Sequence, residues 1–175
     1  DIWDKGKAAV LVSRTEVTDL DGNPLWTLRR SIFARGEGGF GGGRGPSTPN
    51  TTPDRDPDVV TDIAILPQQA LLYRLCGDRN PLHSDPGFAA AAGFPRPILH
   101  GLCTYGMTCK ALVDTLLDAD AARVVSYGAR FAGVVFPGET IRANVWRDGD
   151  RYVGVVTAPD REDATVLSDV TLVSA

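Results

Sequence analysis

The 175-residue chain contains 43% hydrophobic and 23% charged residues, which excludes a disordered or fibrous protein and is typical of a globular one with one good core. Its net charge of −4 gives no general attraction for nucleic acid, so a polyanion such as a nucleotide would need a local basic site. No apolar run approaches the roughly 18 residues of a membrane span, and no secretory signal pattern opens the sequence, so we expect a soluble cytoplasmic protein.

Residues 1–35 predict a β-hairpin. Residues 8–18 alternate as a strand does, residues 21–24 (Asp-Gly-Asn-Pro) form a strong turn signal, and residues 25–35 are typical of the returning strand. An isolated hairpin is only marginally stable in water. We therefore expect a preceding element for this hairpin, either removed from this chain or supplied by another chain.

Residues 36–57 predict a linker, because seven glycines and four prolines fall within them. A phosphate-binding loop would need a Gly-Lys-Ser/Thr sequence and a strand-to-helix junction, and neither is present. The linker is therefore the better interpretation of this glycine-rich segment.

Residues 58–175 predict one complete α+β domain. A strand is expected over residues 59–66 and a short helix over 67–76, with Pro67 at its first position and Gly77 past its end. Asp85 is expected to cap a second short helix over residues 87–92, which Gly93 ends. Four strands are expected after the next helix, over residues 124–135, 139–147, 152–158 and 166–173.

The longest predicted helix runs from residue 101 to residue 117. Its apolar positions recur at a spacing of three and four residues, so one stripe can lie against a sheet. The residues of this stripe are Leu102, Tyr105, Cys109, Leu112 and Leu116. An antiparallel sheet wrapped around one central helix satisfies the order of elements, and that is the hot-dog architecture.

A candidate acid-base pair lies between the two short helices. Asp78 and His83 are separated by Asn80-Pro81, where the proline keeps Asn80 out of the helical region and bends the chain. Such a bend can turn both side chains toward one water molecule, so that one group removes a proton and the other supplies one to carbon. Each residue alone has a simpler explanation, as a turn cap, a structural histidine or an ordinary loop.

A candidate oxyanion site lies at the start of the long helix. The first N–H groups of a helix have no internal partner and lie at the positive end of its dipole, and Gly101 allows close approach of a substrate. A thioester oxygen that becomes enolate-like could be stabilised there. This chemistry needs no metal and no redox cofactor, and Cys76, Cys103 and Cys109 lack the spacing of a zinc site.

Residues 77–83 (Gly-Asp-Arg-Asn-Pro-Leu-His) and 97–101 (Pro-Ile-Leu-His-Gly) together resemble the signature of MaoC-like, type 2 (R)-specific enoyl-CoA hydratases. Many members contain two hot-dog repeats, of which the second is catalytic and the first is degenerate and shapes the acyl pocket. The resemblance implies that residues 1–35 are the closing strands of a first repeat, residues 36–57 the junction and residues 58–175 the catalytic repeat. A His-Gly pair of the family's first repeat is absent from this sequence.

The resemblance also implies roles for individual residues. Asp78 and His83 would be the acid-base pair, Asn80 would orient the water or substrate, and the N–H of Gly101 would belong to the oxyanion hole. Two further segments match substrate-binding parts of the family, residues 4–6 (Asp-Lys-Gly) and residues 129–131 (Ala-Arg-Phe). The residues expected to bind substrate are Lys5, Arg79, Pro81, Leu82, His100 and Phe131. For His100 an anchoring role at the start of the helix is the simpler interpretation, and Phe131 could equally be a core residue.

The expected reaction is the reversible addition of water to a trans-2-enoyl-CoA, with CoA as part of the substrate and no separate cofactor. The alternatives are a dehydratase of carrier-protein or polyketide intermediates, a hydratase of sterol side chains, a thioesterase, and a non-catalytic hot-dog partner subunit. A homodimer is expected because such sheets commonly pair edge to edge. In a eukaryote the location would be the peroxisome.

Overall fold

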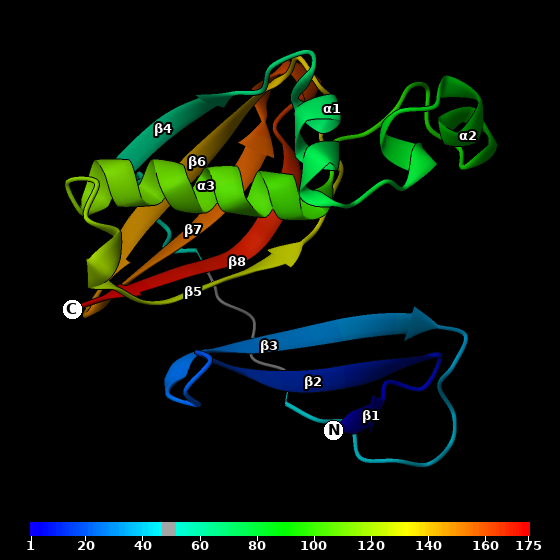
Figure 1. Cartoon of the computed structure of the whole chain (residues 1–175), viewed down its shortest axis with the longest axis horizontal. Helices are drawn as coiled ribbons and strands as arrows, with labels where there is room; N and C mark the ends of the chain where they lie inside the picture. Colours follow the sequence, from blue (N-terminus) through cyan, green and yellow to red (C-terminus); the bar gives the residue numbers. More distant parts are fainter. Residues whose placement is uncertain (47–51) are drawn as a thin grey trace. The chain divides into compact units, whose positions relative to one another are not determined.

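The computed structural model describes residues 1–46 and 52–175. The chain divides into two compact units, Asp1–Thr48 and Pro49–Ala175. Each unit is described by itself (Figure 1).

The first unit is a three-stranded antiparallel sheet in the order β1 (Ile2–Asp4), β2 (Ala8–Thr18) and β3 (Pro24–Arg35). The predicted hairpin is confirmed as β2 and β3, whereas β1 was not predicted. The turn forms because the Asp19 carboxylate accepts hydrogen bonds from the N–H groups of Asp21 and Asn23, and Gly22 adopts a φ of 86°.

The glycine-rich segment after β3 winds around Asp4. The carboxylate of Asp4 accepts hydrogen bonds from the N–H groups of Gly6, Gly39 and Gly41, at 2.7, 2.9 and 2.7 Å. Among residues 36–46 and 52–57 no helix or strand forms, and residues 47–51 of the predicted linker lie outside the described residues. The described part of the linker is therefore irregular, with its beginning tied to β1.

The second unit is built on a five-stranded antiparallel sheet in the order β4-β6-β7-β8-β5 (Figure 1). Its strands are β4 (Val59–Ala64), β5 (Val124–Phe131), β6 (Thr140–Asp148), β7 (Arg151–Ala158) and β8 (Ala164–Ser174). All five strands were predicted, although β5 ends four residues before the expected end. The remaining residues, 132–135, are needed for the loop that closes one side of the site.

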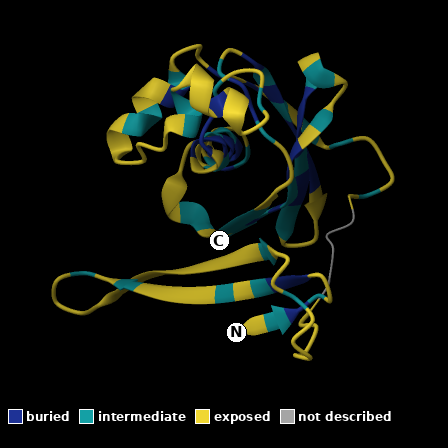
Figure 2. Ribbon diagram, turned by 90° about the vertical axis from the view of Figure 1, so that its right-hand side faces the viewer, coloured by how far each residue is buried: buried dark blue, intermediate teal, exposed yellow. Residues whose placement is uncertain are grey.

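The long helix α3 (Gly101–Leu116) lies across one face of this sheet (Figure 1). The core between them contains Leu112, Val113 and Leu117 of the helical segment, with aliphatic side chains of the strands. Figure 2 shows the buried residues gathered in this helix and the sheet. This is the hot-dog arrangement that the sequence predicts.

The predicted buried stripe of α3 was wrong in part. Leu102 is 60% exposed, whereas Cys103, Thr104 and Thr108 are buried with Leu112. Thr104 can lie on the buried face because its hydroxyl donates to the carbonyl of His100, one turn earlier in the chain. A search for apolar residues alone therefore shifts the stripe away from its true position.

The described residues also form six short helical segments, of which η3 follows the end of α3. They are α1 (Gln69–Tyr73), η1 (Arg74–Cys76), η2 (Pro81–His83), α2 (Pro86–Ala91), η3 (Ala121–Arg123) and η4 (Pro159–Arg161). The carboxylate of Asp85 caps α2 as predicted, by accepting from the N–H groups of Gly87 and Phe88. The predicted helix start at Pro67 was wrong, since the cap residue of α1 is Gln68. Within the described residues, no helix is both long and apolar enough to cross a membrane.

Candidate active site

The loop between η1 and η2 carries the predicted acid. Gly77 ends η1 in the left-handed region, at a φ of 110°, and the chain then turns at Asp78. Oδ1 of Asp78 accepts a hydrogen bond from the N–H of Asn80 at 3.2 Å, and Oδ1 of Asn80 accepts one from the N–H of Leu82 at 3.0 Å. Asn80 thus caps η2, with Pro81 at its first position, and the predicted bend is confirmed.

His83 is the last residue of η2, and one hydrogen bond fixes its ring. Nδ1 lies 2.8 Å from the carbonyl oxygen of Ile98. Because a carbonyl can only accept, Nδ1 carries the proton, and in the neutral ring Nε2 keeps its lone pair. His83 is therefore held in the tautomer that can take a proton from water.

His100 stands behind this pair as the residue that precedes α3. It is 1% exposed, and its Nε2 donates to the carbonyl oxygen of Asp78 at 3.2 Å. Its ring stacks on that of His83, with centroids 3.8 Å apart and planes at 28°, and Tyr73 lies against it at 4.8 Å. Burial lowers the pKa of His100 below its usual range, and the neighbouring His83 lowers it further. His100 is thus a neutral ring that links Asp78 to His83.

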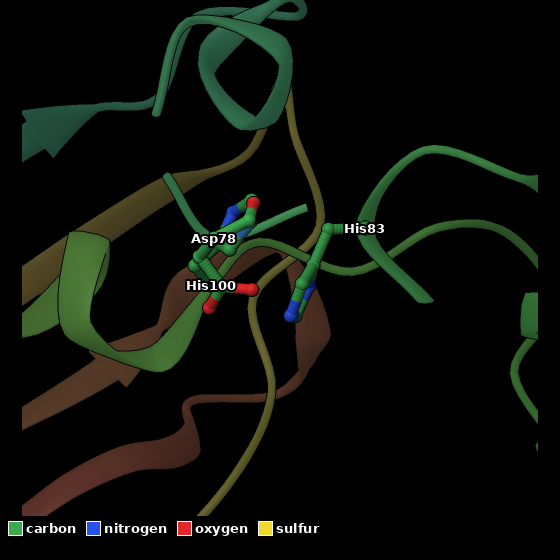
Figure 3. A group of neighbouring side chains, drawn as sticks. All are labelled: Asp78, His83 and His100. Atoms are coloured by element: carbon green, nitrogen blue, oxygen red, sulfur yellow. The ribbon is translucent and has the colours of Figure 1, made fainter. Parts of the chain in front are cut away.

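Asp78, His83 and His100 come from three separate segments and meet in one group (Figure 3). One ligand atom from each residue lies within 4.8 Å of the other two. One carboxylate and two imidazoles can in principle bind zinc. However, the lone pair of an imidazole lies in its ring plane, so two stacked rings do not both point at one ion. The arrangement fits acid-base chemistry better than a metal centre.

A pocket of about 160 Å³ opens beside this group, at the start of α3. His83, Gly101 and Phe131 of the predicted residues line it. A Cβ added at Gly101 would lie 3.2 Å from the ring of Phe131, so a larger residue would narrow the pocket between them. The N–H of Gly101 has no hydrogen-bond acceptor among the described residues, which leaves it available to a ligand.

The other predicted substrate residues lie in several places. Arg79 is exposed on the same loop as Asp78, and Pro81 is exposed at the first position of η2. The carbonyl of Leu82 accepts from the N–H of Ile98 at 3.4 Å. Lys5 belongs to the first unit, where its Nζ donates to the carbonyl of Pro46 at 3.4 Å. The structure does not bring His100 to the pocket wall, and its anchoring at the start of the helix agrees with the simpler interpretation.

Most of the pocket wall was not predicted from the sequence. The further lining residues come from the segment before α3, from α3 itself, from the loop after β5, and from β8. They are Ile98, Leu99, Thr104, Gly133, Val134, Val135, Val166 and Leu167. They are mostly ordinary apolar residues, which carry no local signal. Gly133 is the exception, because a glycine within a predicted strand indicates a close approach of the backbone. In the structure, a Cβ at Gly133 would lie 2.4 Å from the carbonyl oxygen of Thr165.

A sheet wrapped around one helix is a hot-dog domain, and here an Asp-His pair lies close to His100, the residue that precedes that helix. Residues 48–166 match the family described as the MaoC like domain, and the chain belongs to this family. Its structure superimposes on that of a MaoC-like dehydratase from Phytophthora capsici with a TM-score of 0.91 and 35% identity, over 99% of this chain and 59% of the other.

Two proteins of Mycobacterium tuberculosis are also similar to the chain. One is enoyl-CoA hydratase ChsH3, which is 70% identical over 100% of this chain and 61% of its own length. The other is 3-hydroxyacyl-thioester dehydratase Y, which is 51% identical over 84% of this chain and 52% of its own length. The chain thus spans about half to three fifths of the length of these relatives.

Proposed function

We propose that the protein is an (R)-specific 2-enoyl-CoA hydratase that adds water reversibly to a trans-2-enoyl-CoA. Two observations carry this proposal. Asp78 meets His83, with ligand atoms within 4.8 Å of each other, and His83 lines one pocket together with Gly101, whose N–H has no acceptor among the described residues and can bind a ligand. The name of the relative with 70% identity, an enoyl-CoA hydratase, supports it.

The proposed step places one water molecule between Asp78 and His83. One of the two groups takes a proton from the water while its oxygen bonds to C3 of the substrate. The electron pair of the C2–C3 double bond moves toward the thioester carbonyl, and the other group, which must enter the step protonated, delivers its proton to C2. The two groups then return to their starting states by proton exchange with solvent. Because Asp78 and His83 lie close together, both additions are proposed to occur from the same face of the substrate, so the addition is syn. The (3R) configuration of the product is what the family resemblance implies.

The helix start stabilises the charge that develops in this step. The thioester oxygen becomes enolate-like, and the N–H of Gly101 points from the positive end of α3. The CoA handle belongs to the substrate, so the reaction requires no separate cofactor. The apolar wall suits the acyl group, with Phe131 and Leu82 as proposed acyl contacts and Lys5, Arg79 and Pro81 as further proposed substrate residues. His100, which is buried and does not line the pocket, is proposed to anchor the site instead.

The test follows the loss of the conjugated thioester of trans-2-butenoyl-CoA by the full-length protein, with chiral analysis of the product. Asp78→Asn and His83→Ala are each expected to lower kcat by at least about a hundredfold without unfolding the protein, a loss within the range for acid-base groups. Asp114→Asn is the matched control, because this carboxylate lies on the exposed side of α3 and pairs with Lys110. Near-normal turnover by Asp78→Asn, or an (S)-product, would contradict the proposal.

A second candidate keeps the site and changes the carrier. The relative with 51% identity is named a 3-hydroxyacyl-thioester dehydratase, which leaves the thioester carrier open. Comparison of kcat/KM for the same acyl group on CoA and on an acyl-carrier protein separates the two. A value at least about tenfold higher on the carrier protein, equal to about 1.4 kcal/mol, would favour this candidate.

We also propose that the protein is a cytoplasmic homodimer, or peroxisomal in a eukaryote. β4 and β5 are the edge strands of the five-stranded sheet, and an edge presents backbone groups that can pair with another sheet. Sedimentation equilibrium of the full-length protein tests the dimer. A monomer at micromolar concentration would contradict it.

A further inference from the structure

One side of the pocket is formed by the wall loop, which we define as residues 132–139 between β5 and β6. Gly133, Val134 and Val135 of this loop line the pocket. At its start, the N–H groups of Ala132 and Gly133 donate to the carbonyl of Val166 on β8. The wall loop has no helix or strand of its own, so its shape depends on contacts with other segments.

A partly buried ion pair holds the other end of this loop. Glu139 is 7% exposed, and Oε1 of its carboxylate lies 2.8 Å from Nε of Arg161, on η4. Nη2 of Arg161 donates both to Oε2 of Glu139, at 3.2 Å, and to the carbonyl oxygen of Val134, at 2.6 Å. Oε2 of Glu139 also accepts from the N–H of Phe136 at 3.0 Å. The pair therefore fixes the backbone of the wall loop at two points.

The wall loop is also hydrogen-bonded to the segment that precedes α3. The carbonyl of Val135, next to the one that Arg161 holds, accepts a hydrogen bond from the N–H of Leu99 at 2.7 Å. Leu99 lies two residues before Gly101. A displacement of the wall loop would therefore move both a side of the pocket and the segment that leads to the Gly101 N–H.

A second cation holds the outside of the loop. Arg96 donates to the carbonyl oxygen of Pro137 at 3.0 Å, and its guanidinium lies 4.9 Å from the ring centre of Phe136. The guanidinium of Arg161 lies 5.4 Å from the same ring. The two guanidinium groups therefore restrain the wall loop more than contacts with solvent alone would.

We propose that Arg161 and Glu139 are positioning residues that set the shape of the acyl pocket and the place of the Gly101 N–H. This inference rests on the proposed function, since it gives the pair a role in the choice of acyl chain. Neither residue touches the reacting atoms. A point charge such as lysine cannot contact Glu139 and the Val134 carbonyl together in the manner of the planar guanidinium.

The test compares Arg161→Lys and Glu139→Gln with Arg142→Lys in the full-length protein. Arg142 is a matched control, because it forms a similar two-pronged pair with Asp62 on the surface of β6 and β4, at 2.7 and 2.9 Å. We measure kcat and KM for a short-chain and a long-chain 2-enoyl-CoA. Arg161→Lys is expected to change the ratio of the two kcat/KM values by at least about fivefold, because small displacements strongly affect reactivity.

A purely structural role would lower kcat equally for both substrates and leave each KM unchanged, and that result would overturn the proposal. Glu139→Gln keeps an oxygen for the Phe136 N–H, and it is expected to change the ratio in the same direction but less. If Arg161→Lys does not fold, this variant decides the question alone. Arg142→Lys is expected to leave the ratio unchanged, and an equal shift in it would also count against the proposal.

A readout without substrate separates this inference from the proposed function. Amide hydrogen exchange of Leu99, measured by nuclear magnetic resonance, is expected to rise by about tenfold in Arg161→Lys while the amides of β7 remain protected. An unchanged Leu99 amide would overturn the positioning role even in a protein with full activity. If the wild-type protein had no hydratase activity but Arg161→Lys still raised the exchange of the Leu99 amide, only the proposed function would be contradicted.

Discussion

The two units of the chain contrast in how their apolar residues are covered. In the first unit, only Asp4, Ala8 and Ala9 of residues 1–46 are buried, and Trp26 and Phe33 of β3 are each 60% exposed. In the second unit, a helix covers one sheet face and closes a core around it (Figure 2). A turn and a register are enough to specify a hairpin, but a pocket with a catalytic pair needs a second layer.

The largest expected effect concerns two leucines, one from each unit. Leu112 of α3 is 1% exposed, and Leu112→Ala is expected to lower the free energy of unfolding by about 2–5 kcal/mol. Leu28 of β3 is 50% exposed, and Leu28→Ala is expected to change it by about 0.5 kcal/mol or less. Urea unfolding measures both. Equal losses would contradict the contrast, because they would mean that Leu28 is covered in solution.

A smaller effect concerns two glycines of the second unit. A Cβ at Gly133 would lie 2.4 Å from the backbone oxygen of Thr165, so Gly133→Ala is expected to destabilise the protein by about 1–3 kcal/mol. A Cβ at Gly106 on α3 would meet no atom within 4 Å, so Gly106→Ala is expected to stabilise the helix by up to about 1 kcal/mol. Thermal unfolding compares the two. A stable Gly133→Ala variant would show that the wall loop is not held tightly against β8.

The smallest effect belongs to the first unit and depends on pH. The N–H groups of Gly39 and Gly6 hold the pKa of Asp4 below its usual range. Because the folded pKa is depressed, the stabilisation is complete above the unfolded value of about 3.9 and is lost as the pH falls through the folded value. The amide shifts of Gly39 and Gly41 are therefore expected to move together only at a pH below the unfolded value of about 3.9. Asp4→Asn should remove this transition, and a shared midpoint at or above about pH 3.9 would contradict the lowered pKa.

The sequence predicted those parts of the structure whose signals are local. Asn80-Pro81 fixes a bend by covalent geometry, and Asp85 precedes its helix directly, so both appear where the pattern indicated. Asp78 and His83 are only five positions apart, and one turn is enough to bring them together. Each of these features is determined by a few residues that are neighbours in the sequence.

The parts that sequence analysis missed depend on distant contacts. Nothing near Arg161 indicates that it holds the backbone of Val134, because 27 positions separate them. Thr104 and Thr108 were missed as buried residues of α3, because both side chains are polar. The hydroxyl of Thr104 bonds to the carbonyl of His100 in the preceding turn, which makes this threonine compatible with a core. The pocket wall was therefore a property of the folded sheet and helix together.

The central claim is that Asp78 and His83 act on one water molecule as a unit. A double-mutant cycle of kcat for trans-2-butenoyl-CoA, with Asp78→Asn, His83→Ala and both changes together, tests it most directly. If the two groups act as a unit, the double variant should be no more than about threefold slower than the slower single variant. If each single variant loses about a hundredfold and the double variant loses about ten-thousandfold, the two losses multiply. The groups then act independently, and the proposal of one shared water molecule is contradicted.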